Sequence, residues 1–286
     1  MPVRNAPTAR QLRLGAELRK LRERAGLTST EAGRLLGTNQ AQISNIEASR
    51  FGVSAERVRT LARNYDCSDL DLIEALVGMT GERKRGWWEE YREILPLGLL
   101  DLAEMEHHAK ALRVAVVIHV PGLLQTLDHA RASLREAVPP LRPHALEHHV
   151  SYRMKRQAIL YGDHGDRPTP YTTIVHEAAL RMGVGGRDVA RRQLAHLIEM
   201  SEHENVEVRV IPFGAWAFVS SGQSITYATG PVPLLDTVEL DTAHGCEFLD
   251  AEAQLAKYRV VLDRMSSGGL TPEKSRDLIH SIAQSL

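Results

Sequence analysis

The sequence predicts a multidomain chain, with a small all-α domain over residues 1–77 and a mixed α/β (or α+β) domain over residues 87–286. In the first part, leucines recur at spacings of three and four residues, which is the repeat of one helical face. In the second part, helical repeats alternate with short runs of branched residues that are typical of strands. The charged, glycine-punctuated segment GMTGERKRG at residues 78–86 separates the two patterns, and we expect it to be a linker.

Five short helices are expected in the first part, because each apolar repeat is bounded by a capping residue or a glycine. Leu14 and Leu18 share one face of the first helix, and Gly26 ends it. Thr28, followed three residues later by Glu31, forms a capping box for the second helix. The expected helices cover residues 10–25, 28–36, 39–47, a segment from residue 54 and a segment around residues 70–76.

The larger part is expected to alternate helices with strands. Helical periodicity appears at Trp87–Leu112, Leu123–Val138, Pro143–Tyr161, Arg187–His203, Ala251–Met265 and Pro272–Gln284. Strand-like runs appear at Val114–Val120, Tyr171–His176, Val206–Ile211, Ser224–Ala228 and Thr237–Leu240. This alternation favours an α/β or α+β architecture.

Charge is distributed unevenly along the chain, although the net charge of all 286 residues is only −1. Residues 1–64 hold twelve Arg and Lys against five Glu, whereas residues 65–286 hold 23 basic against 31 acidic side chains. A basic segment of this kind favours a polyanionic partner.

The composition also bears on the compartment. Cys67 and Cys246 lie far apart in no CxxC pattern, which fits a reducing cytoplasm better than a disulfide scaffold. No apolar run approaches the ~18 residues of a membrane helix, and Met1–Arg10 lacks the apolar stretch of a secretory signal. We therefore expect a cytoplasmic protein with no membrane partner.

Residues 29–46, STEAGRLLGTNQAQISNI, meet the demands of a helix-turn-helix. Two helices packed at a steep angle through a tight turn need a small residue at the close approach, and Gly33 supplies it. The turn needs a positive φ, which costs Gly37 little. The inward positions are expected to be Ala32, Leu36, Ile43 and Ile46.

The outward face of the helix over residues 39–47 is rich in short and amide side chains. Amides bond in bidentate fashion to adenine, and a small methyl side chain contacts thymine. The expected base contacts are Gln40, Ala41, Gln42 and Asn45. The expected phosphate contacts are Thr28, Ser29, Asn39, Ser44, Arg10, Arg13 and Arg50.

The segment LTSTEAGRLLGTNQAQISNIE resembles the Xre, or lambda-repressor-like, class of helix-turn-helix. The resemblance implies a five-helix lambda-repressor-like domain, with Gln40 at a common base-contacting position and Glu47 at the usual glutamate. Two departures stand out: Gly33 replaces the usual alanine, and Ala48 with Ser49 replaces a residue followed by glycine. The second departure predicts that the following loop differs from that of the class.

The second part resembles the uncharacterised C-terminal domain of actinobacterial regulators, including the WhiJ-like regulators of streptomycetes. The motifs that carry this resemblance are VPGLLQTLDHARA, RMKRQ, HEAALRMGVGG, RRQLAHLIEM and VEVRVIPF. It implies a small BldB-like protein partner. Together, the two resemblances lead us to expect a nucleoid-associated transcriptional regulator, a repressor of development or secondary metabolism, that binds a palindromic double-stranded DNA operator as a homodimer.

Several alternatives for the second part remain open. A polar pocket for a ligand or partner, or else a salt-bridged interface, is expected from Arg153, Arg156, Gln157, Glu177 and Arg181. His196, Glu199 and His203 share a helical face on which a metal is conceivable, but surface histidines are the expectation. GVGG is not a nucleotide-binding motif. We expect no cofactor, no metal and no catalysis; the competing classes are an antitoxin-like binder that autoregulates and an enzyme with a DNA-binding tether.

Overall fold

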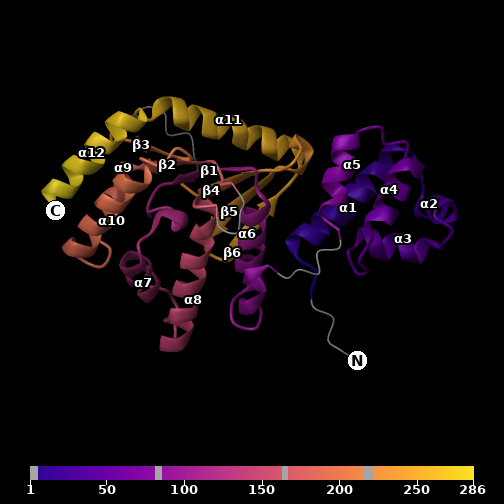
Figure 1. The fold of residues 1–286 in the computed structure, drawn as a ribbon, viewed down its shortest axis with the longest axis horizontal. Coiled ribbons are helices and arrows are strands. Elements are labelled where there is room, and N and C mark those ends of the chain that lie inside the picture. The colour runs from indigo at the N-terminus through magenta and orange to yellow at the C-terminus, as the bar shows by residue number, and fades with distance from the viewer. Residues whose placement is uncertain (1–5, 81–85, 163–166, 216–221) are drawn as a thin grey trace. The chain divides into compact units, whose positions relative to one another are not determined.

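The computed structural model describes residues 6–80, 86–162, 167–215 and 222–286 (Figure 1). The chain divides into two compact units, Met1–Trp87 and Trp88–Leu286. Most of the linker expected from the sequence, residues 81–85, lies outside the described residues. Each of the two units is a compact body of its own.

The first unit is built from helices, as the sequence predicts. They are α1 (Ala9–Arg24), α2 (Ser29–Leu35), α3 (Gln40–Glu47), α4 (Ala55–Asn64) and α5 (Leu70–Val77). A side-chain oxygen caps the start of each of the five by accepting a backbone N–H; the capping residues are Thr8, Thr28, Asn39, Ser54 and Asp69. Each cap satisfies a helix-end donor that would otherwise lack a partner, and Leu18, Ile43 and Leu61 are among the fully buried core residues.

The second unit is built on a six-stranded mixed sheet. Its strands are β1 (Ala111–Val116), β2 (Tyr171–His176), β3 (Val206–Ile211), β4 (Ser224–Thr229), β5 (Thr237–Thr242) and β6 (Gly245–Leu249), in the order β3-β2-β1-β4-β5-β6. The strands β1, β2 and β3 pair in parallel, and β4, β5 and β6 add to β1 in antiparallel fashion. This confirms the expected mixed α/β class.

Helices cover both faces of the sheet and give three layers (Figure 1). One face packs against α11 (Glu252–Gly268) through a cluster that includes Ile174, Val238 and Leu262. The other face packs against a second cluster that includes Val208 and Leu197. The helices on that side are α6 (Leu97–His108), α7 (Leu127–Arg135), α8 (Pro143–Arg156), α10 (Arg187–Met200) and α12 (Pro272–Ser285), and the short α9 (Glu177–Arg181) follows β2.

The long helix predicted over Trp87–Leu112 is wrong. The chain forms the 3-10 helix η1 (Trp87–Tyr91), restarts as α6 after Pro96 and then enters β1 at Ala111. Proline cannot continue the helix before it, which divides the segment. β1 accordingly begins three residues earlier than Val114, the start expected from the sequence.

Two further boundaries and one strand differ from the expectations. Leu123–Val138 is divided between η2 (Gly122–Leu124) and α7, and the last turn of Pro143–Tyr161 is η3 (Gln157–Leu160). The edge strand β6 was missed because its five residues GCEFL carry no run of branched residues and none of them is fully buried. No helix in the described ranges is both long and apolar enough to cross a membrane.

Candidate nucleic-acid interface

The turn between α2 and α3 has the geometry that the sequence demands. A Cβ placed on Gly33 would lie 2.9 Å from the carbonyl carbon of Asn39, so α2 meets the start of α3 at a distance that excludes alanine. Gly37 adopts a φ of +69°, in the left-handed region that glycine enters at little cost. The close approach of the two helices therefore explains why a glycine stands at position 33.

The inward residues of the motif form the small core. Ala32, Ile43 and Ile46 are buried, with 3% or less of their surface exposed. Leu36, which was expected to be inward, is only partly buried because it lies at the C-cap of α2. The apolar side of α3 therefore faces the rest of the domain, and its polar side faces outward.

The predicted base-contacting residues lie on the outward side of α3. Gln40 and Ala41 are exposed, while Gln42 and Asn45 are partly buried. The Thr38 hydroxyl donates to Oε1 of Gln42, which fixes that amide close to the turn. Gln40 is the amide at the exposed N-terminal end of the helix, the end that reaches base edges in proteins of this motif.

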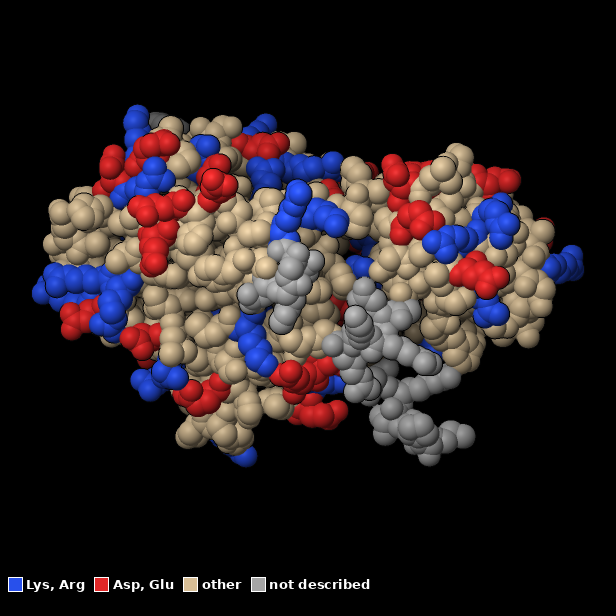
Figure 2. Space-filling model, viewed as in Figure 1, with Lys and Arg blue, Asp and Glu red and all other residues tan. Residues whose placement is uncertain are grey.

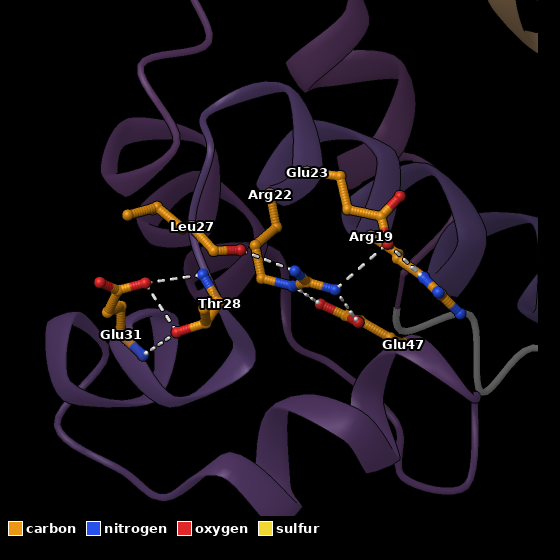
Figure 3. A network of polar contacts seen from close by, with 7 residues as sticks. All are labelled: Arg19, Arg22, Glu23, Leu27, Thr28, Glu31 and Glu47. Atoms are coloured by element: carbon orange, nitrogen blue, oxygen red, sulfur yellow. Dashed lines mark hydrogen bonds and ion pairs between the residues drawn. The ribbon is translucent and has the colours of Figure 1, made fainter.

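A buried ion pair holds α3 in place (Figure 3). Arg22 of α1 donates from Nε and Nη2 to the two carboxylate oxygens of Glu47, at 2.6 and 2.9 Å, and from Nη1 to the Leu27 carbonyl at 2.7 Å. Each of the two charged side chains is only 9% exposed. The hydrogen bond to Glu47 raises the pKa of Arg22, although burial opposes the shift. Glu47 thus orients the recognition helix and does not itself face outward.

The start of α2 is less suited to a phosphate than expected. Thr28 accepts from the Glu31 backbone N–H, and its hydroxyl and backbone N–H both donate to Glu31 Oε2, at 2.6 and 2.8 Å (Figure 3). These bonds lower the pKa of Glu31 and keep its carboxylate charged. The Thr28 hydroxyl therefore serves as a cap next to a fixed negative charge, which disfavours a phosphate, and its role as a phosphate contact stays a prediction.

Two of the expected phosphate-contacting arginines are engaged within the domain. Arg13 is 8% exposed and pairs with Glu17 at 2.8 Å, so its assignment as a phosphate contact is wrong. Arg10 donates from Nη2 to the Gly78 carbonyl at 3.0 Å, which ties α1 to the end of α5. These contacts could not be predicted from the sequence, because helical spacing alone does not show which face of α1 another helix covers.

The remaining phosphate candidates stay predictions. Asn39 caps α3 by accepting from the backbone N–H of Gln42 at 3.0 Å. Ser44 and Arg50 are exposed, and Ser29 is partly buried. On the face of the first unit shown in Figure 2, acidic and basic side chains are interspersed. The net positive charge of residues 1–64 therefore does not mark a single patch on that face.

Two residues that shape this interface escaped the sequence analysis. Gly15 of α1 lies against the end of α3, where an added Cβ would be 2.4 Å from the Glu47 carbonyl oxygen. Ser49 adopts a φ of 55°, the left-handed conformation that glycine usually takes, and its hydroxyl donates to the Gln11 carbonyl at 2.6 Å. The loop after α3 thus keeps a glycine-like backbone at Ser49. The signal for this loop in the sequence was the presence of Ser49 where the resembling proteins have a glycine.

Comparison with protein families gives two matches. Residues 13–76 match a family described as a helix-turn-helix domain. Residues 99–281 match the family described as "Domain of unknown function (DUF5753)", and this match spans more than half of the chain. The chain belongs to the DUF5753 family. No curated protein and no solved structure matches the chain. The helix-turn-helix domain indicates a DNA-binding regulator.

Three of the predicted ligand-site residues of the DUF5753 domain lie on or just after α8. Arg156 forms a two-bond ion pair with Glu106 of α6, at 2.7 and 2.5 Å, and Glu106 is 3% exposed. Gln157 donates to the Gln125 carbonyl at 2.7 Å, and Arg153 donates to Gln125 Oε1 at 2.8 Å. Arg156 and Gln157 are therefore internal ties between elements, as in the salt-bridged alternative, and do not line a ligand pocket through these contacts.

The other two predicted residues of that DUF5753 site are engaged elsewhere. Glu177 accepts from Arg181 Nε at 2.7 Å and from the Phe213 backbone N–H at 2.8 Å, which joins the start of α9 to the end of β3. These bonds and the nearby charge of Arg181 lower the pKa of Glu177, although burial opposes the shift. The contacts of Glu177 and Arg181 are thus those of a local salt bridge, and they do not involve Arg153 or Arg156.

The metal and nucleotide alternatives both concern α10 of the DUF5753 domain and the loop before it. His196 approaches Glu199 at 3.4 Å, but His203 stacks edge-on against Tyr161. Within the described residues, no group of three His, Cys, Asp or Glu is arranged to hold a metal ion. The GVGG loop ends at Gly186, which begins α10 with a φ of 85° and makes no side-chain cap.

Proposed function

We propose that this protein is a sequence-specific transcriptional repressor of the Xre class that inserts α3 into the major groove of its operator. The observation that carries the proposal is the exposed amide end of α3, beside the Gly33 and Gly37 turn, on a helix fixed by Arg22 and Glu47. Gln40 and Asn45 suit adenine, and Ala41 suits a thymine methyl. We therefore expect half-sites rich in A·T pairs.

Two copies of the chain are proposed to bind together. A single helix-turn-helix contacts few base pairs, so proteins of this kind pair on palindromes with half-sites about one helical turn apart. The DUF5753 domain supplies the dimer contact and receives a signal from a BldB-like small protein or a ligand, as in the WhiJ-like regulators that the sequence resembles. The proposal places the protein at the nucleoid of the cytoplasm and assigns no reaction to it.

Selection of bound oligonucleotides from a random pool by the full-length chain tests the DNA-binding part. The expected result is enrichment of an A·T-rich palindrome with half-sites separated by about 10 base pairs. Enrichment of no sequence at all, at low and at moderate salt, would contradict the proposal. A non-palindromic enriched site would contradict the dimer.

Genome-wide mapping of bound DNA, with and without the proposed BldB-like partner, tests the control by a partner. The expected result is that the protein occupies the same operators in both cases but to a different extent. Stoichiometric copurification of that partner, with occupancy confined to the protein's own promoter, would instead favour the antitoxin-like alternative.

A further inference from the structure

The face of the sheet that is turned toward α6 and α8 is polar on one half. Thr226 of β4 pairs with Glu239 of β5, and Ser224 pairs with Asp241, so these side chains share a face with Val114 of β1. This face is turned toward α6, because the added Cβ of Gly98 would lie 3.6 Å from the Cβ of Cys246, which pairs with Asp241. Buried polar groups normally have hydrogen-bond partners, so polar side chains on a covered sheet face call for a structural or functional explanation.

Arg153 on α8 is the cation of this region that lacks an acidic partner. Arg156, one turn away, is fully matched by Glu106, whereas Arg153 donates to the neutral amide of Gln125. Among the described residues, no carboxylate lies within the 4.0 Å of an ion pair with Arg153. Burial, together with the charge of Arg156, lowers the pKa of Arg153 to about 10. Arg153 is partly buried, so an anion at its guanidinium would compensate the lost hydration better than the neutral amide does.

Two histidines from other elements flank Gln125, the residue that Arg153 binds. Gln125 Nε2 donates to the carbonyl of Val120, which follows His119, and Gln125 lies four residues before His129. His129 of α7 is 3% exposed, and within the described part of the chain its Nδ1 has no hydrogen-bond partner. His119, in the loop after β1, is partly buried with Nε2 3.4 Å from the Ser224 hydroxyl. Burial and the charge of Arg153 lower the pKa of both rings, that of His129 to about 4. Both rings are therefore neutral near pH 7.

We propose that Arg153, His119 and His129 form a binding site for the carboxylate group of a small metabolite. The fork of the guanidinium matches a carboxylate, and the buried ring of His129 offers a polar atom that has no partner in the described structure. One cation compensates one negative charge, and Asp241, which is exposed at the rim and close enough to affect His119 and Arg153, opposes a dianion such as phosphate. Arg153 also repels a metal ion.

The site deepens the proposed function, because it gives the DUF5753 domain a ligand class through which DNA affinity is controlled. Only that regulatory consequence rests on DNA binding. Ligand binding changes DNA affinity only if the ligand distinguishes two arrangements of the protein. Occupancy of the site itself is measured without DNA, so failure of the site and failure of the repressor are separate results.

Thermal unfolding of the full-length chain in sodium acetate, against sodium chloride and inorganic phosphate at equal ionic strength, tests the site. At an acetate concentration about ten times its Kd, Tm is expected to rise by about 2–4 °C over chloride. Arg153→Gln should abolish this rise, whereas the control Arg181→Gln, which changes the arginine of a local pair on α9, should keep it. An equal rise in Arg153→Gln, or a larger rise with phosphate than with acetate, would overturn the proposal.

A second measurement needs no substitution and so holds even if Arg153→Gln does not fold. Imidazole ¹⁵N resonances of the parent protein are followed while acetate replaces chloride. Those of His119 and His129 are expected to shift and saturate, while those of His196, which lies on α10 beside Glu199, stay in place. No saturable shift at His119 or His129 would contradict the site.

Discussion

The buried and partly buried arginines of the two units differ in the partners that they bind. In the helix-turn-helix unit, Arg22 and Glu47 satisfy each other through two hydrogen bonds, and a backbone carbonyl takes a third. In the DUF5753 unit, Arg156 has the same kind of partner in Glu106, but its neighbour Arg153 has only an amide.

This difference distinguishes residues that hold the fold together from a residue that can bind a ligand. A matched buried pair fixes one arrangement of the helices that carry it, whereas a buried cation without its anion invites a ligand. In the first unit, the surface proposed to bind DNA is accordingly the exposed, uncharged side of α3. In the second unit, the proposed ligand site lies at the polar half of a covered sheet face.

The largest effect is expected from removing one member of the matched pair. Glu47→Ala leaves Arg22 buried without its anion and should lower the free energy of unfolding by about 3–5 kcal/mol. Hydrogen exchange of the α1 and α3 amides in the full-length chain measures this. The control is Glu74→Ala, which breaks the exposed pair with Arg59 and should change little; equal effects of the two substitutions would contradict the role of the buried pair.

Glu239 offers a test in the DUF5753 unit, because its surroundings raise the pKa of the carboxyl group where an ion pair would lower it. Burial, helped by the charge of Asp241, raises its pKa to about 7, so between about pH 4.5 and 7 the folded state binds a proton that the unfolded state has lost. Stability from this group is therefore present at low pH and is lost as the pH rises toward 7.

Glu239→Gln should remove that loss. The free energy of unfolding of the variant, relative to that of the parent, should increase by on the order of 3 kcal/mol from pH 5 to pH 8. Urea unfolding of both proteins at the two pH values measures the difference. A difference that is the same at pH 5 and pH 8 would show that Glu239 is ionised in the folded state throughout.

Gly15→Ala tests the close contact of α1 with the end of α3. The added methyl would meet the Glu47 carbonyl oxygen at 2.4 Å, and overpacking of this kind costs about 1–3 kcal/mol. Gly52→Ala is the control, because nothing lies within 4 Å of its added Cβ. Thermal unfolding followed by circular dichroism should show a loss for Gly15→Ala alone; equal stability of the two variants would mean that α1 and α3 do not approach this closely.

The smallest effect is expected at Ser49. Both Ser49→Ala and Ser49→Gly lose the hydrogen bond to the Gln11 carbonyl, but only glycine is free of the left-handed penalty. Ser49→Gly should therefore be about 1 kcal/mol more stable than Ser49→Ala. The reverse order in chemical unfolding would place Ser49 outside the left-handed region.

Local patterns predicted the parts of this fold that local physics decides. The capping residues Thr28 and Asn39 and the glycine turn fixed the ends of α2 and α3, and branched runs fixed the bounds of β2 (Tyr171–His176) and β3 (Val206–Ile211). The exposed strand β6 had no such pattern, and Pro96 broke a helix whose periodicity continued across it.

The parts of the sites that depend on distant contacts could not be predicted in the same way. Arg13 and Arg153 both look like surface cations in the sequence, and only the packing of other elements buries Arg13 and partly buries Arg153. Glu106, the partner of Arg156, lies 50 residues away along the chain. Spacing therefore predicted which side of α3 is turned away from the core, but charge and spacing did not predict which arginines are structural.

Operator affinity of Gln40→Ala tests the central claim most directly, namely that the outward side of α3 reads DNA. Fluorescence anisotropy with the selected operator should show a loss of about 1–3 kcal/mol in specific binding, with discrimination lost at one base pair of each half-site. Thermal stability should match that of the parent, because Gln40 is exposed. Equal affinity and equal sequence preference in the two proteins would contradict the account.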